Sequence, residues 1–214
     1  MNRETCKIKI CGLSRPEDIE AANEIGPDYI GFVFAKSSRQ VTYERAARLK
    51  EMLDGRIKAV GVFVNALPEE ILALSEGIGG ISPVIDMIQL HGDEDEDYIK
   101  RIKECTSKPI IKAVRVRSRE DIIKAQALPC DYLLLDTFTK GQYGGSGQQF
   151  DWSMIPKVPK PYFLAGGICM DNIRKAADQG AFCIDVSSAV ETNGKKDRTK
   201  MKAIVEVLRN GQRR

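Results

Sequence analysis

The sequence contains one histidine and no pair of cysteines in a C-x-x-C arrangement. A single histidine cannot complete a Cys/His metal set, and isolated cysteines do not form a dithiol redox motif. We therefore expect no metal site and reduced thiols, each by default a small buried hydrophobic side chain. The six cysteines are scattered along the chain, as Cys6, Cys11, Cys105, Cys130, Cys169 and Cys183.

Long hydrophobic runs and blocks of like charge are also missing. No run approaches the ~18 apolar residues that a membrane-spanning helix needs, and MNRETCKIKI at the start has no apolar segment of signal-peptide length. We therefore expect a cytoplasmic protein that does not enter a membrane. The 33 basic and 30 acidic residues are interspersed and leave a net charge of +3. This pattern argues against nucleic-acid binding and leaves room for a small anionic ligand.

What the sequence does contain is an alternation of strand and helix signals. The 214 residues, 43% of them hydrophobic, suffice for one domain over residues 1–214. Short apolar, β-branched runs predict eight strands: Cys6–Cys11, Tyr29–Phe34, Ala59–Val64, Met87–Leu90, Ile110–Val114, Tyr132–Leu135, Tyr162–Ala165 and Cys183–Val186.

Helix-start signals follow these strands at 14–17, 42–45, 68–70, 93–97, 118–121 and 171–173, and the segment 195–214 is expected to form a closing helix. We expect a helix after each of the eight strands. About 27 residues per unit is consistent with a compact single (β/α)8 TIM barrel. A doubly wound open sheet shares the alternation, but it usually has fewer strands and no G-x-G-x-x-G follows the first strand here.

In such a barrel, chemistry is expected at the carboxyl ends of the strands. Cys11 and Lys9 share one face of the first strand, and Gly12 follows. An ammonium beside a thiol favours the thiolate, which can act as a base or a nucleophile. The alternative interpretation of Cys11 is a packed hydrophobic side chain.

Three further polar residues follow predicted strands. Arg39 lies in a polar loop and could bind a carboxylate with both arms of its guanidinium, although a solvated loop is the simpler interpretation. His91 shares a face with Gln89, and a lone histidine is more often structural than functional. Asp136 follows three leucines, and these apolar surroundings favour the protonated form that a general acid needs.

Two glycine-containing patterns predict a phosphate site. Gly166 and Gly167 follow the seventh strand, while Ser187 and Ser188 follow the eighth. In phosphate-binding barrels these two loops hold the phosphate through backbone N–H groups and hydroxyls. The loop after Asp136 contains Gly144-Gly145-Ser146-Gly147, which could contact an anion or close as a lid, or could be a plain flexible loop.

The motifs together resemble those of the phosphoribosylanthranilate isomerases, a family of tryptophan biosynthesis. They occur in order between Lys9 and about Lys196: Lys9-Ile10-Cys11-Gly12, Gly31-Phe32-Val33-Phe34 with Ser38-Arg39, Gly61-Val62-Phe63-Val64-Asn65, Gln89-Leu90-His91-Gly92, Leu135-Asp136-Thr137, Gly144-Gly145-Ser146-Gly147 with Phe150-Asp151-Trp152, Ala165-Gly166-Gly167 and Asp185-Val186-Ser187-Ser188.

The resemblance implies a barrel enzyme without cofactor or metal that isomerises N-(5-phosphoribosyl)anthranilate by an Amadori rearrangement. It implies Cys11 as the general base and Asp136 as the general acid. It further implies substrate binding by Arg39, through the anthranilate carboxylate, and by Asp185 and His91 near the reacting sugar. The phosphate ligands would come from Gly145, Gly147, Gly166, Gly167, Ser187 and Ser188.

The sequence departs from the family pattern at two places. Cys169-Met170-Asp171-Asn172 lacks a proline common before the asparagine, and Ala189 stands where glycine is frequent. Both affect the geometry of the phosphate loops and neither removes a catalytic group. The expected partner is a small phosphorylated substrate, and the sequence is compatible with a monomer or a homodimer.

The sequence alone leaves three alternative functions open. Another phosphosugar barrel enzyme is possible. An indole-glycerol-phosphate synthase would need a catalytic lysine and glutamate at strand ends, and a metal-dependent epimerase would need several histidines. A barrel that binds a phosphorylated ligand without catalysis would not need both Cys11 and Asp136. A thiol-dependent redox protein would need paired cysteines.

Overall fold

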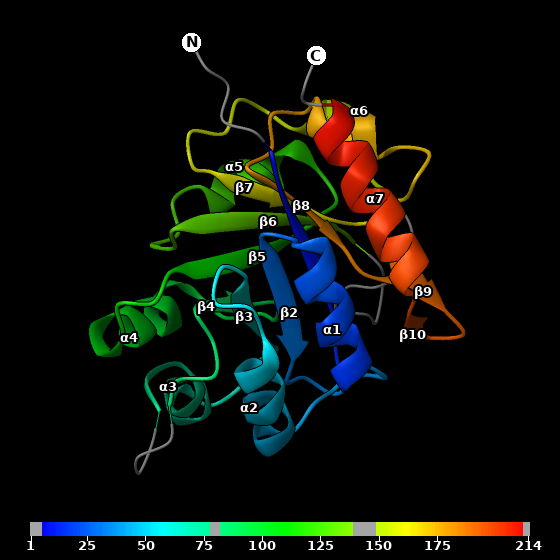
Figure 1. The fold of residues 1–214 in the computed structure, drawn as a ribbon. Helices are drawn as coiled ribbons and strands as arrows, with labels where there is room; N and C mark the ends of the chain where they lie inside the picture. The colour runs from blue at the N-terminus through cyan, green and yellow to red at the C-terminus, as the bar shows by residue number, and fades with distance from the viewer. Residues whose placement is uncertain (1–5, 78–81, 139–148, 212–214) are drawn as a thin grey trace.

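Eight parallel strands form a closed barrel in the computed structural model, which describes residues 6–77, 82–138 and 149–211 (Figure 1). Each strand pairs with the next one along the chain, and the last pairs with the first. The predicted barrel is confirmed. The strands are β1 (Lys7–Cys11), β2 (Tyr29–Val33), β3 (Lys58–Phe63), β4 (Met87–Leu90), β5 (Ile110–Val116), β6 (Tyr132–Thr137), β7 (Tyr162–Leu164) and β8 (Cys183–Val186).

Helices connect the strands and cover the outside of the barrel (Figure 1). The expected helix after the sixth strand is not found in the described part of that segment, which holds the short 3-10 helix η1 (Trp152–Met154). The α-helices are α1 (Pro16–Ile25), α2 (Tyr43–Met52), α3 (Pro68–Glu76), α4 (Glu96–Cys105), α5 (Arg119–Ala125), α6 (Ile173–Ala177) and α7 (Arg198–Gly211). None of the described helices is both long enough and apolar enough to cross a membrane.

Local capping explains where the helices begin. The hydroxyl of Thr42 accepts a 3.3 Å hydrogen bond from the backbone N–H of Arg45, and the carboxylate of Asp95 accepts one of 2.8 Å from Tyr98. Pro16 and Pro68 stand in the first turn of their helices, where the missing N–H has no intrahelical partner to lose. These ends fix the loops that carry the candidate site residues.

The two ends of the barrel interior differ in polarity. Near the amino ends of the strands, the rings of Tyr29, Tyr132, Phe163 and Phe182 pack together, with a centroid distance of 5.6 Å between Tyr29 and Phe163. Farther along the strands the buried side chains become polar. They include Lys9, Gln89, Asp136 and Asp185. The aromatic cluster closes one end of the barrel, so any site accessible to a ligand belongs at the carboxyl ends of the strands.

A short antiparallel hairpin after β8 was not predicted. Its strands are β9 (Glu191–Thr192) and β10 (Lys195–Lys196), preceded by the 3-10 helix η2 (Ser188–Val190). Asn193 and Gly194, between the strands, both have positive φ, at 51° and 73°. Two positive φ angles in a two-residue loop are typical of a type I′ turn. The closing helix therefore begins at Arg198 and not at residue 195, as the sequence had predicted.

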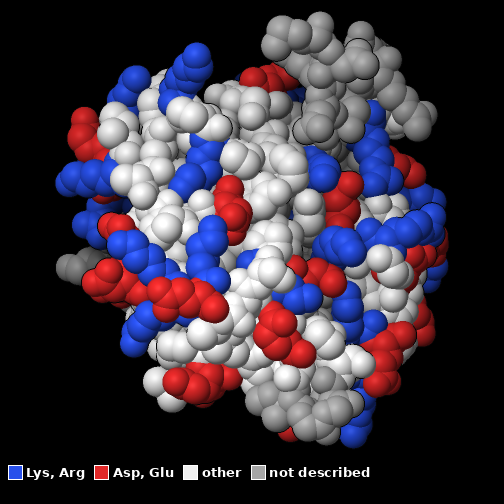
Figure 2. All heavy atoms as spheres, turned by 90° about the vertical axis from the view of Figure 1, so that its left-hand side faces the viewer, with Lys and Arg blue, Asp and Glu red and all other residues white. Residues whose placement is uncertain are grey.

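Charges on the face of the molecule that carries α3 and α4 are mixed (Figure 2). Figure 2 shows the side of the molecule that carries α3 and α4, where basic and acidic side chains alternate without a large patch of one sign. This face agrees with the interspersed charges of the sequence.

Candidate active site

The first polar cluster lies where β1 meets β8. Lys9 is fully buried, and its Nζ donates a 2.8 Å hydrogen bond to Oδ2 of Asp185, its register partner on β8. Cys11, two residues farther along β1, is half-buried. Burial raises the pKa of the Cys11 thiol, while the positive charges of Lys9 and Lys196 lower it without fully compensating. Lys9 thus favours the thiolate as expected, but burial sets the direction of the net shift.

The second cluster connects β4 with β6. His91 Nε2 lies 3.2 Å from Oδ2 of Asp136, and the backbone N–H of Thr137 donates a 2.8 Å hydrogen bond to Oδ1. On the other side of the imidazole, Gln89 Nε2 lies 2.8 Å from His91 Nδ1. With this amide as donor, Nδ1 accepts and Nε2 carries the proton that points at Asp136. Gln89 and His91 share a face, as predicted, and together they hold the carboxylate of Asp136.

Asp185 and Asp136 influence each other electrostatically. Burial raises the pKa of Asp185, Lys9 lowers it, and the negative charge of Asp136 raises it further. Oδ1 of Asp185 is buried and has no hydrogen-bond partner among the described residues. It is therefore an available acceptor for a hydroxyl group of a ligand. Across residues 6–77, 82–138 and 149–211, no group of three or more His, Cys, Asp or Glu side chains is arranged to hold a metal ion.

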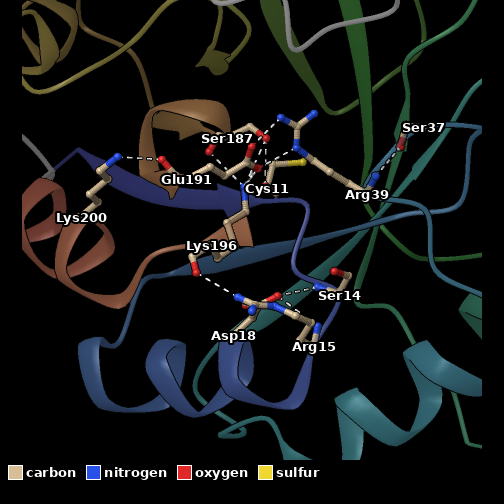
Figure 3. Close-up of polar contacts among 10 residues, drawn as sticks. All are labelled: Cys11, Ser14, Arg15, Asp18, Ser37, Arg39, Ser187, Glu191, Lys196 and Lys200. Atoms are coloured by element: carbon tan, nitrogen blue, oxygen red, sulfur yellow. Dashed lines mark hydrogen bonds and ion pairs between the residues drawn. The ribbon is translucent and has the colours of Figure 1, made fainter. Parts of the chain in front are cut away.

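Arg39 lies over the barrel mouth, beside Cys11, and is already paired (Figure 3). Its Nε and Nη2 donate hydrogen bonds of 2.7 Å and 2.8 Å to the two carboxylate oxygens of Glu191. Its side chain crosses close to Gly12, where an added Cβ would lie 2.5 Å from Arg39 Cδ. The loop itself is largely exposed, as the solvated alternative predicted, but the Arg39 side chain is partly buried and the carboxylate that it binds here belongs to the chain itself.

The glycines expected to bind phosphate adopt backbone conformations that favour glycine. Gly166 and Gly167 have φ of 83° and 62°. A Cβ at Gly166 would collide with Thr137 and Asp136, so this loop packs directly on the end of β6. The other two predicted glycines, Gly145 and Gly147, lie outside the described residues.

The two serines of the predicted phosphate site differ in their surroundings. Ser187 Oγ donates a 3.1 Å hydrogen bond to the carbonyl of Cys11 and accepts one of 3.4 Å from Lys196 Nζ. Its hydroxyl proton is thus used within the protein. Ser188 is exposed. Of the two hydroxyls, only that of Ser188 is placed to donate to a ligand without first breaking a bond within the chain.

Sequence reasoning missed two charged residues of this mouth, Glu191 and Lys196. Lys196 Nζ lies 2.6 Å from Oε1 of Glu191 and donates to the carbonyl of Ser187 at 3.0 Å. The signal that could have revealed them is Asn193-Gly194, because Asn-Gly is a strong marker of a tight hairpin. A hairpin at this position places Glu191 opposite Lys196.

Residues 8–207 match the sequence model of the N-(5'-phosphoribosyl)anthranilate (PRA) isomerase family. The chain belongs to this family. A curated N-(5'-phosphoribosyl)anthranilate isomerase from Endomicrobium trichonymphae is 46% identical over 205 residues, which cover 95% of this chain and 98% of the relative. The resemblance seen in the motifs is confirmed.

Solved structures of phosphoribosylanthranilate isomerases share the fold. The enzyme from Thermus thermophilus superposes with a TM-score of 0.83 at 29% identity, over 95% of this chain and 98% of that one. A second, at 32% identity and a TM-score of 0.78 over 96% and 99% of the two chains, was solved in complex with reduced 1-(o-carboxyphenylamino)-1-deoxyribulose 5-phosphate.

Proposed function

We propose that the protein converts N-(5-phosphoribosyl)anthranilate to 1-(2-carboxyphenylamino)-1-deoxyribulose 5-phosphate, an Amadori rearrangement of tryptophan biosynthesis. Family membership supports the reaction. The observation that carries the mechanism is the placement of a thiol and a carboxylate on separate strands of one barrel mouth, Cys11 on β1 and Asp136 on β6. Two strands, β7 and β8, separate them around the barrel, so they can flank one sugar.

Asp136 acts as the general acid that opens the ribose ring. It transfers its proton to the ring oxygen as the C1–O bond breaks, and the nitrogen lone pair forms an iminium with C1. The carboxylate that remains accepts hydrogen bonds from His91 Nε2–H and Thr137 N–H. Because these donors stabilise the charge that develops, they lower the cost of giving up the proton.

Cys11 acts as the general base in the following step. The iminium acidifies the C2 proton, which the thiolate removes, and the C2–H electrons form the enolamine. The enolamine then tautomerises to the aminoketone. Lys9 and Lys196 favour the thiolate through their positive charge. Oδ1 of Asp185, buried and unpartnered among the described residues, accepts a sugar hydroxyl.

The two anionic ends of the substrate supply binding energy without reacting. Arg39 binds the anthranilate carboxylate. The phosphate is bound by backbone N–H groups of Gly166, Gly167, Ser187 and Ser188 and by the hydroxyl of Ser188. The left-handed glycines of the loop after β7 support the phosphate assignment. We also assign phosphate binding to Gly145 and Gly147, which lie outside the described residues.

Free thiols support a cytoplasmic location. Cys11, Cys105, Cys130, Cys169 and Cys183 form no disulfide, as expected of a protein in a reducing compartment. We also infer one domain over residues 1–214, acting on a small phosphorylated substrate and not on nucleic acid. The hydrophobic core supports a single domain because buried residues from β1 to α7 belong to one continuous cluster.

The decisive experiment follows the fluorescence decay of phosphoribosylanthranilate generated in place from anthranilate and phosphoribosyl pyrophosphate. Wild type should consume it, and Cys11→Ala and Asp136→Asn should each lose at least ~100-fold in kcat, the usual effect of removing a general acid or base. Cys105→Ala is the matched control because Cys105 is exposed at the end of α4. An inert wild type that still binds the reduced product analogue would instead make the protein a binding barrel.

A further inference from the structure

Arg39 has two edges that can each bind a carboxylate, and only one is used within the chain. A guanidinium carries five N–H donors in a fixed plane. Glu191 takes the edge formed by Nε and Nη2, at 2.7 Å and 2.8 Å. The other edge, formed by Nη1 and the second hydrogen of Nη2, makes no hydrogen bond among the described residues. Arg39 can therefore bind a second carboxylate without releasing Glu191.

Glu191 is held in place independently of Arg39. It stands directly opposite Lys196 in the β9–β10 pair, and Lys196 Nζ contacts its Oε1 at 2.6 Å. Lys200 Nζ donates a 2.8 Å hydrogen bond to the carbonyl of Glu191, and Arg15 Nη2 donates one of 2.9 Å to the carbonyl of Lys196 (Figure 3). The hairpin is thus tied to the starts of α1 and α7, and it presents Glu191 at a defined point above Cys11.

The charge of the cluster remains favourable to an anion. Arg39 and Lys196 contribute two positive charges and Glu191 one negative charge, so the three carry a net charge of +1. Both cations also interact electrostatically with Cys11. Glu191 therefore orients the guanidinium without cancelling the net positive charge of this three-residue cluster.

We propose that Glu191 is a positioning residue that holds Arg39 with its free edge toward the carboxylate of the substrate, while Lys196 and the hairpin hold Glu191. This inference rests on the proposed role of Arg39. In the alternative design, Glu191 blocks Arg39 and the substrate carboxylate must displace Glu191. The two designs predict opposite effects of removing the charge of Glu191 on the affinity for a ligand that carries the carboxylate.

The test measures binding by calorimetry, so it does not depend on turnover. One ligand is reduced 1-(o-carboxyphenylamino)-1-deoxyribulose 5-phosphate, and the other is its phenylamino counterpart, which lacks the carboxylate. Glu191→Gln should weaken binding of the first ligand by about tenfold and of the second by less than about twofold. Only the first ligand has a carboxylate that binds the oriented guanidinium of Arg39. Tighter binding of the first ligand would establish the blocking design and overturn the proposal.

A double-variant cycle tests whether Glu191 acts through Arg39. Glu191→Gln should add nothing to the loss of affinity caused by Arg39→Gln, because the guanidinium that Glu191 orients is then already absent. Additive losses, or equal weakening of both ligands, would reduce Glu191 to a general structural role. Glu191→Asp, which keeps the charge, should fall between wild type and Glu191→Gln and remains informative if the latter does not fold.

Matched controls separate this inference from the assignment of function. Glu24→Gln removes an exposed ion pair with Arg198 on the outside of the barrel and should leave both affinities unchanged. Wild-type turnover is measured in parallel. If wild type is inert but the ligand pattern appears, the isomerase assignment fails and the role of Glu191 stands. If wild type is active and Glu191→Gln binds both ligands normally, only the role of Glu191 fails.

Discussion

Lys9 and Asp185 form a 2.8 Å ion pair inside the barrel, at the seam where the first strand meets the last. They are register partners, so the pairing of β1 with β8 places the two charges together. The ammonium is fully buried and the carboxylate is 8% exposed. Closure of the barrel and assembly of the site therefore depend on the same contact.

Lys9→Met should destabilise the protein by about 3–5 kcal/mol, because it leaves the buried charge of Asp185 without a partner. Adding Asp185→Leu removes that charge and should recover most of the loss, although the double variant loses the site. Urea unfolding of the three proteins measures this directly. Equal stability of single and double variants would show that the pair contributes only packing.

The reactivity of the Cys11 thiol should rise with pH across the neutral range. Burial raises the pKa of Cys11 above its ordinary value of 9.0, so the thiol predominates near pH 7 and each increase in pH adds active thiolate. The rate of Cys11 alkylation reports the thiolate alone, whereas kcat/KM also requires protonated Asp136. Measured in a Cys105→Ala background, the alkylation rate should climb between about pH 6 and 9. A flat alkylation profile would contradict the raised pKa of Cys11.

Gly12→Ala should weaken both the fold and the site. At φ 86° an alanine is strained by about 1–3 kcal/mol, and its Cβ would also displace Arg39. Gly180→Ala is the control, since φ is 76° there and no atom lies within 4 Å of the added Cβ. Both variants should lose stability in thermal unfolding, but only Gly12→Ala should raise KM. An unchanged KM would mean that Arg39 can move without consequence.

Glu191 should contribute to stability in a defined pH window. Burial raises its pKa, but hydrogen bonds from Arg39 and Lys196 outweigh this and lower the pKa from 4.5 to about 2. The charged form thus stabilises the folded state, fully so above about pH 4.5, and this contribution is lost as the pH falls toward 2. The difference in unfolding free energy between wild type and Glu191→Gln should therefore shrink between pH 5 and about pH 2. A constant difference would argue against the pairing.

The strands were predictable because their signal is local. Apolar, β-branched runs set all eight within two residues at each end, and alternation placed Lys9 and Cys11 on one face. The sixth strand runs two residues beyond its predicted end, so Asp136 lies within it and not after it. The third strand begins one residue early, at Lys58, a solvent-facing position that an apolar run does not mark.

The partners of the charged residues were not predictable in the same way. Arg39 and Glu191 are 152 residues apart, and Lys9 and Asp185 are 176 apart. The register of β1 with β8 produces the Lys9–Asp185 pair, and the Arg39–Glu191 pair joins the loop after β2 to the hairpin after β8. No local pattern contains either pairing. The hairpin that carries Glu191 escaped detection because two-residue strands have no visible periodicity.

The seam between β1 and β8 has a consequence for how the protein is made. During synthesis β1 leaves the ribosome first, and the carboxylate that neutralises Lys9 follows 176 residues later. Until then burial of the Lys9 ammonium is unfavourable because no carboxylate neutralises its charge, and β1 lacks its second neighbour in the sheet. A chain that stops short of Asp185 therefore carries Cys11 on an open edge strand. The reactive thiol acquires its electrostatic setting only in a chain that has been translated nearly to its last helix.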